Sequence, residues 1–132
     1  MTIDSTSIDT GHPQRDLHLR SADFLHVERF PTLSYRSTSL GALDAAGWFR
    51  LEGSLTIRDV TRPVMLEAEY RGSVHDPGGA RRCAFSAMTT INRHDFGVRW
   101  NDILDSGGIV LGNEIDIGLE VQAILREERR ER

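Results

Sequence analysis

The sequence predicts an all-β domain, an antiparallel sandwich or barrel, with one short helix. Apolar and polar residues alternate with period two in four separate segments, which indicates strands with one buried face and one solvent-facing face. Turn-forming residues separate these segments at short intervals, as is typical of antiparallel sheets. The chain has 132 residues, the size of one domain with room for a core.

The short helix is expected at residues 21–29, before the first full strand. Ser21 suits the N-cap because its hydroxyl can accept a hydrogen bond from an amide of the first helical turn. Asp23 would then lie at the positive end of the helix dipole. Phe24 would face the core, and Pro31 would end the segment.

Two strands are expected next, at residues 32–39 and 48–57. In the first strand, Leu33 and Tyr35 face inward. In the second, the odd-numbered residues 49–57 face inward, because successive side chains of a strand point to opposite faces of the sheet.

Two further strands are expected at residues 64–71 and 82–91, separated by the strong turn sequence Asp76-Pro77-Gly78-Gly79. Residues 58–61 are few enough to join antiparallel neighbours. Cys83, on the inward face of the later strand, is expected to act as a small apolar residue. As the sole cysteine, it cannot form an intrachain disulfide.

The clearest strand is at residues 114–126, where the odd-numbered residues 115–125 are apolar and face inward. The irregular stretch 92–112 precedes it, and a loop this long in a small domain is usually functional or mobile. Residues 1–126 are therefore expected to form one domain, and residues 127–132 a charged, solvated tail.

Four stretches of the chain together resemble the YceI family of polyisoprenoid-binding, lipocalin-like proteins. They are Arg15-Asp16-Leu17-His18-Leu19-Arg20-Ser21-Ala22-Asp23-Phe24, Arg29-Phe30-Pro31-Thr32-Leu33-Ser34-Tyr35, Leu55-Thr56-Ile57-Arg58-Asp59-Val60-Thr61-Arg62-Pro63-Val64 and Asn92-Arg93-His94-Asp95-Phe96-Gly97. The resemblance runs from about residue 3 to residue 125. It implies an extended eight-stranded antiparallel barrel with a short helix, which binds isoprenoid-tailed or other long-chain amphiphiles.

The chain departs from this family at its N-terminal end. In the family, two strands and most of a third precede the Arg15-Asp16 motif, whereas here only a stub at residues 2–10 precedes it. Such a barrel is expected to be incomplete, with open edges that expose unpaired main-chain groups. Three explanations stay open: a misassigned start, a short form completed by dimerisation or strand exchange, and an inactive fragment.

The inward faces can form either a filled core or a ligand tunnel, and periodicity alone does not decide between these. The resemblance favours a tunnel. The expected lining is Leu33, Tyr35, Phe49, Leu51, Leu55, Leu66, Phe85, Ile91, Phe96, Trp100, Ile115, Ile117 and Leu119. Trp100, Ile103 and Leu104 are expected to cover a mouth.

The expected function is therefore non-catalytic binding, carriage or storage of a polyisoprenoid or other long-chain lipid. No cofactor is required, although a bound isoprenoid lipid or quinone would fit. One alternative is a small hydrolase or isomerase that uses Asp95 and His94; another is an interaction module that accepts a strand from a partner. Arg93 and Asp95 are expected to hold their loop in shape, as His18 and Asp16 hold the chain around the helix. The histidines have no metal-ligand spacing, so no metal site is expected.

Composition and charge indicate which classes of partner and which compartment to expect. The net charge of −4 does not suggest nucleic acid as a partner. No apolar run reaches the roughly 20 residues of a membrane span, and the start lacks the pattern of a signal peptide. We therefore expect a cytoplasmic protein with at most transient membrane contact, able to form a homodimer.

Overall fold

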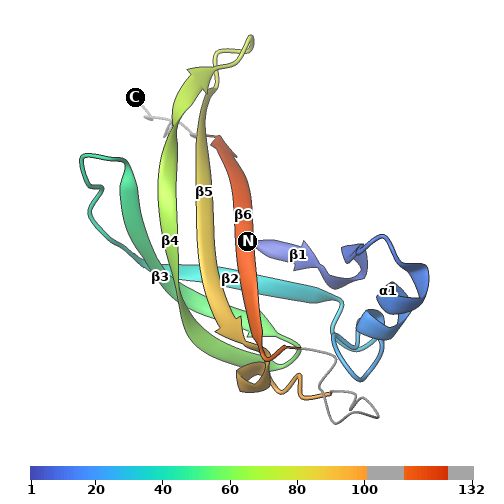
Figure 1. The fold of residues 1–132 in the computed structure, drawn as a ribbon. Helices are drawn as coiled ribbons and strands as arrows, with labels where there is room; N and C mark the ends of the chain where they lie inside the picture. Colours follow the sequence, from blue (N-terminus) through green and yellow to red (C-terminus); the bar gives the residue numbers. More distant parts are fainter. Residues whose placement is uncertain (101–111, 125–132) are drawn as a thin grey trace, which may run out of the picture.

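The computed structural model describes residues 1–100 and 112–124, which form one antiparallel sheet curled around an apolar concave face (Figure 1). Each strand pairs with the next in the sequence, in the order β1-β2-β3-β4-β5-β6. The strands are β1 (Thr2–Asp4), β2 (Thr32–Leu40), β3 (Trp48–Ile57), β4 (Val60–His75), β5 (Arg81–Asn92) and β6 (Glu114–Ile124). One α-helix, α1 (Pro13–Arg20), and two 3₁₀ turns, η1 (Ser5–Ser7) and η2 (Arg93–Phe96), complete the described part.

The sheet curls strongly, so that β2 runs across the direction of β5 and β6 (Figure 1). Register shifts between Ser37 and Ser39 of β2, and between Tyr70 and Ser73 of β4, mark two irregularities in the ladder. Gly72, inside the second irregularity, has φ 107°. Extra residues of this kind bend a strand and increase its twist, which brings the two ends of the sheet toward each other.

The predicted strands and their inward faces are confirmed, except that β4 extends beyond the expected residues 64–71 at both ends, from Val60 to His75. Ile57 pairs directly with Val60, so β3 and β4 are joined by the two-residue turn Arg58-Asp59, and β4 begins four residues earlier than expected. Arg58 takes the positive φ of 57° that such a tight hairpin requires. The predicted turn after β4 is also present, where the Asp76 carboxylate accepts hydrogen bonds from the amides of Gly78 and Ala80.

The helix lies before the segment where it was predicted. Residues 21–29 form turns, and Ser21 caps the C-terminal end of α1, donating its amide hydrogen to the His18 carbonyl. His26 has φ 48°, which interrupts any helix there. Pro13 suits the first turn of α1, but Leu17 is exposed, so the helix lacks the apolar stripe that sequence reasoning looks for.

The core occupies one end of the concave face, where η2 and the hairpin between β3 and β4 lie. Its buried members are Phe24, Ile57, Ile91, Phe96 and Val98. Half-buried residues pack around them, including Trp100, whose ring meets that of Phe24 at 5.2 Å between centroids. Phe24 therefore faces the core as predicted, although it lies in a turn.

The sheet is not closed within residues 1–100 and 112–124. There, β1 pairs with β2 alone and β6 pairs with β5 alone. The prediction of an all-β, lipocalin-like and incomplete barrel is confirmed. The predicted tail, residues 127–132, and the predicted mouth residues Ile103 and Leu104 lie outside the described residues. Among those that are described, no helix is long and apolar enough to cross a membrane.

Candidate ligand-binding groove

A groove of about 900 Å³ occupies the part of the concave face that the core leaves uncovered. Its walls come from β2 to β6, from the start of the chain and from the segment after β2. The lining residues are Met1, Thr2, Ser34, Tyr35, Arg36, Ser37, Leu40, Gly41, Leu43, Phe49, Leu51, Leu66, Ala68, Tyr70, Phe85, Ala87, Leu119 and Val121.

Strand register explains why this region is hollow. Phe49, Ala68, Ala87 and Leu119 lie side by side on four successive strands, so two alanines form the floor between two larger side chains. Ala68 is buried and Ala87 is half-buried. Because a methyl group stands where the flanking strands carry a ring or an isobutyl group, the row leaves space above its centre.

Aromatic residues border this floor. The Phe85 ring lies 5.8 Å from the Phe49 ring and 5.7 Å from the Tyr70 ring, measured between centroids. Tyr70, Phe85 and Val121 form a second row in register across β4, β5 and β6. These separations are typical of aromatic pairs that pack together, so the three rings support one another in this wall of the groove.

Tyr35 separates the groove from the core. Its hydroxyl donates to the Val64 carbonyl oxygen at 2.8 Å, and the side chain is buried although it contributes to the groove lining. Burial raises the pKa of the Tyr35 phenol, and the negative charge of Glu52 raises it further. The phenol is therefore neutral at physiological pH and acts as a structural donor.

The groove has a polar side and an apolar side. The polar residues of the lining are Thr2, Ser34, Arg36 and Ser37, and all four belong to β1 or β2. Of these, Ser37 shares the face of Tyr35, and the other three alternate to the opposite face of the sheet. The lining from β3 to β6 is apolar apart from the Tyr70 hydroxyl. This division suits a ligand with a long apolar chain and a polar end.

The residues predicted to line a tunnel divide between the groove and the core. Tyr35, Phe49, Leu51, Leu66, Phe85 and Leu119 line the groove. Ile91 and Phe96 belong to the buried core, Leu33, Leu55, Trp100 and Ile117 pack against it, and Ile115 is exposed. Trp100 packs at the core end, so it does not lie over the groove.

Sequence reasoning missed several groove residues. Ala87 and Val121 lie on inward faces that the alternation predicted. Ala87 pairs with Leu119 and Val121 pairs with Phe85, so their partners are both residues that were expected in the lining. Leu40 and Leu43 lie beyond the predicted end of their strand, and no periodic signal marks them.

The loop after β5 has the structural role that was predicted for Arg93. This buried side chain donates from Nε to the Gly112 carbonyl at 2.9 Å, and from Nη1 to the carbonyls of Val98 and Trp100. For Asp95, the structure shows a main-chain contact instead: its carbonyl accepts from Arg62 Nε at 3.1 Å, and its side chain is exposed.

The segment around α1 is also held as predicted, with one additional contact. The Asp16 carboxylate accepts from the amide of Thr10 and from its hydroxyl, and these bonds lower the pKa of Asp16. The His18 carbonyl accepts from the amide and the hydroxyl of Ser21, and its side chain adds a second contact, because Nε2 lies 2.8 Å from the Asp23 carboxylate. Its ring also packs against Phe24 and Trp100.

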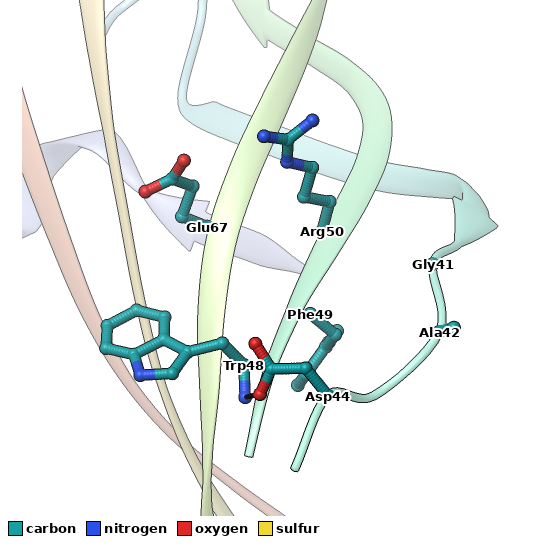
Figure 2. Close-up of a pocket in the computed structure, with 7 residues that line it drawn as sticks. All are labelled: Gly41, Ala42, Asp44, Trp48, Phe49, Arg50 and Glu67. Carbon is teal, nitrogen blue, oxygen red and sulfur yellow. Dashed lines mark hydrogen bonds between the residues drawn. The ribbon is translucent and has the colours of Figure 1, made fainter. Parts of the chain in front are cut away.

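A smaller hollow of about 410 Å³ lies near the start of β3 (Figure 2). Arg50 and Glu67 line it from the outer face of the sheet, opposite one another in register. Asp44 also lines this hollow, and its carboxylate accepts hydrogen bonds from the amides of Ala46 and Trp48. This hollow lacks the continuous apolar lining of the groove. Among the described residues, no three His, Cys, Asp or Glu side chains are placed to hold a metal ion.

Comparison with known proteins gives one consistent result. The family model described as "YceI-like domain" matches residues 1–123. Protein YceI of Escherichia coli O157:H7 is 38% identical over 128 residues, and a UPF0312 protein of Pseudomonas aeruginosa is 38% identical over 125 residues. Each alignment covers 94% of this chain but only 61% of the relative, so the chain spans less than two thirds of the length of these relatives.

Solved structures have the same fold. A crystal structure of a Campylobacter jejuni YceI protein superposes with a TM-score of 0.79 at 26% identity, covering 96% of this chain and 71% of that one. BcnA of Burkholderia cenocepacia superposes with a TM-score of 0.76 at 19% identity, covering 92% of this chain and 71% of that one. The second likeness concerns the fold alone.

Proposed function

This chain belongs to the YceI-like domain family, and from that premise we propose that its groove binds the apolar chain of a polyisoprenoid or another long-chain amphiphile. The proposed role is carriage or storage, without catalysis. The observation that carries the proposal is the groove of about 900 Å³, whose floor and walls from β3 to β6 are apolar.

The size and lining of the groove support this class of ligand. Small-molecule sites typically measure about 300–1,000 Å³, so this groove is at the upper end of that range. Each methylene group that leaves water contributes about 0.8 kcal/mol, and a chain of about ten such groups would gain about 8 kcal/mol before the cost of association. Long-chain lipids are the ligands that can use such a surface with few polar contacts.

The polar residues along β1 and β2 suggest how the ligand would be oriented. Ser37 lies on the same face of β2 as Tyr35, whereas the side chains of Ser34 and Arg36 alternate to the other face of the strand. A hydroxyl or carbonyl head group could bond to the Ser37 side chain while the tail lies over Ala68 and Ala87. Since these contacts are few and exposed, they would give modest selectivity between head groups.

The catalytic alternative has less support from the geometry. Neither His94 nor Asp95 lines the groove, and the Asp95 side chain is exposed beyond the core end of the sheet. No carboxylate or imidazole occurs among the lining residues of the groove. An acid–base pair must lie within hydrogen-bond reach of its substrate. A ligand in this groove would not be within that reach of His94 and Asp95.

The proposal is tested by filling the groove. Ala87→Trp places an indole on its floor, whereas Met88→Trp, one residue away, places the same group on the exposed outer face. Binding of the fluorescent polyene fatty acid parinaric acid is measured for the 132-residue chain and both variants. Native mass spectrometry and organic extraction then identify any lipid that copurifies.

We expect Ala87→Trp to weaken parinaric acid binding at least tenfold and Met88→Trp to leave it within about twofold of the unchanged chain. Equal binding by all three proteins would refute the groove as the site. Thermal melting of each variant separates loss of binding from loss of folding. Asp95→Asn should leave binding unchanged, and turnover of a bound lipid that this substitution abolishes would favour the catalytic alternative.

A further inference from the structure

The groove has a closed end, where it meets the core. On each strand from β3 to β6, the inward residues change from core packing to groove lining at one point. These changes fall between Leu55 and Leu51, Val64 and Leu66, Ile91 and Ala87, and Ile117 and Leu119. An apolar chain that lies in the groove can therefore extend only as far as this boundary on its core side.

On β3 and β4, the side chain of Tyr35 forms the boundary. Its ring lies over Gly53, which separates Leu55 from Leu51 on the inward face of β3. Its hydroxyl lies 2.8 Å from the Val64 carbonyl oxygen on β4 and 3.3 Å from the Leu51 carbonyl oxygen on β3. The ring thus spans two strands at the level where the groove ends.

The Tyr35 ring is held firmly in this position. The side chain is buried, and its only hydrogen-bond donor is engaged by main-chain oxygens of the two strands that it crosses. A chain that approaches the core would therefore meet an aromatic ring and not a free hydroxyl. Because side chains in such a region are closely packed, no space is left for the chain to pass the ring.

Apolar surface continues on the far side of the ring. Leu55 lies opposite Tyr35 in register, and Val64 lies opposite Gly53. Both Leu55 and Val64 are half-buried and pack against the core. If the ring were absent, a longer chain would find further apolar side chains to contact, and each additional methylene group would leave water.

We propose that Tyr35 sets the maximum length of apolar chain that the groove holds. This inference rests on the proposed function and adds to it a residue that determines specificity. Methylene groups that cannot pass the ring stay in water and contribute nothing to affinity. Each methylene group that is buried improves affinity about fourfold, so affinity should rise with chain length up to a limit and then stay constant.

This length limit is measured with saturated fatty acids, from decanoic to eicosanoic acid in even-numbered steps, that compete with parinaric acid for the delipidated chain. Tyr35→Ala removes a ring whose area corresponds to roughly five methylene groups. Neighbouring side chains will close part of the space, so we expect the length limit to move to chains about two to four carbons longer.

Leu51→Phe tests the same boundary from the groove side. Leu51 is half-buried, lies opposite Leu66 in register and lines the groove next to the ring. A larger side chain there shortens the space in front of Tyr35, so we expect the length limit to move to shorter chains. General damage to the groove would instead weaken all the fatty acids by the same factor.

Two further variants separate the ring from its hydroxyl and from the core behind it. Tyr35→Phe returns the ring without the hydroxyl, so it should restore the length limit that Tyr35→Ala has lost. Val64→Ala removes apolar atoms on the core side of the ring, so it should leave the length limit where it is in the unchanged chain. Circular dichroism and thermal melting show whether each variant is folded.

Three results would overturn this inference and leave the proposed function intact. One is the same length limit in Tyr35→Ala and in the unchanged chain. Another is a limit that Val64→Ala lengthens as much as Tyr35→Ala does, because the core would then set the length. The last is a limit in Tyr35→Phe that equals that of Tyr35→Ala, because the hydroxyl and not the ring would then be responsible.

The remaining outcomes also decide between the two proposals. If Tyr35→Ala does not fold, Leu51→Phe provides the test, and a length limit that this substitution does not shorten would overturn the inference. If the unchanged chain binds neither parinaric acid nor any of the fatty acids, the proposed function fails, and the role of Tyr35 in setting the length fails with it.

Discussion

The Tyr35 side chain lies directly against Gly53 on the neighbouring strand. A Cβ atom at Gly53 would be 2.6 Å from both Cζ and the hydroxyl oxygen of Tyr35, and 2.5 Å from the Arg36 carbonyl oxygen. Only a residue without a side chain leaves room for the phenol to cross β3 and reach the Val64 carbonyl. This contact holds Tyr35 at the boundary between the groove and the core.

Gly53→Ala is expected to destabilise the protein by about 1–3 kcal/mol, the usual cost of an extra methyl group in a packed site. The free energy of unfolding in urea measures this. Gly118→Ala, where a Cβ meets nothing within 4 Å, is the control and should change stability far less. Equal effects of the two substitutions would show that the phenol moves aside at little cost.

Tyr35→Phe keeps the ring and removes its hydrogen bond to Val64, so we expect a loss of about 1 kcal/mol at neutral pH. Burial raises the pKa of Tyr35 above its usual value of 10.0. Its contribution to stability is therefore present below pH 10 and is lost as the pH rises through the pKa of the folded state. Urea titrations at neutral and alkaline pH should show a smaller alkaline loss for Tyr35→Phe than for the unchanged chain.

Asp16→Asn is expected to remove part of the acid sensitivity of the protein. The Thr10 hydroxyl, as the largest cause, lowers the pKa of Asp16 below 3.8, and the Thr10 amide and the charges of Arg20 and Arg15 lower it further. The resulting stability is present above about pH 4 and is lost as the pH falls through the pKa of the folded state. Thermal melting from neutral to acidic pH measures this. If the melting temperature falls equally with decreasing pH in Asp16→Asn and in the unchanged chain, Asp16 is not a source of the acid sensitivity.

Arg93→Lys is expected to destabilise the protein by about 3 kcal/mol, although it keeps the charge. The guanidinium donates to three carbonyl groups from two nitrogens, and a lysine ammonium cannot reproduce this planar arrangement. It would remain a buried cation with fewer partners. Arg99→Lys, at a nearby exposed position, is the control. If Arg93→Lys destabilises the protein no more than Arg99→Lys does, the Arg93 side chain does not hold the loop.

The sequence alone determined the strands, their inward faces and most of their turns, because these depend on local rules. The alternation in β6 is visible in a few residues, and Asp76-Pro77-Gly78-Gly79 predicts its turn without help from the rest of the chain. The same reasoning did not predict the position of α1, because Leu17 is exposed and the helix has no apolar stripe. The helix is held instead by the hydrogen bonds between Asp16 and Thr10, which the spacing of apolar residues does not reveal.

Only the tertiary structure decided which inward residues form the core and which line the groove. Ile117 and Leu119 lie two residues apart on the same face of β6, yet Ile117 packs against the core and Leu119 lines the groove. The difference arises because Phe24 and Phe96, from segments far apart in the sequence, cover one end of the concave face. Strand periodicity shows which face of the sheet a side chain is on. Whether that side chain is packed in the core or lines the groove depends on which other segments of the chain cover that part of the face.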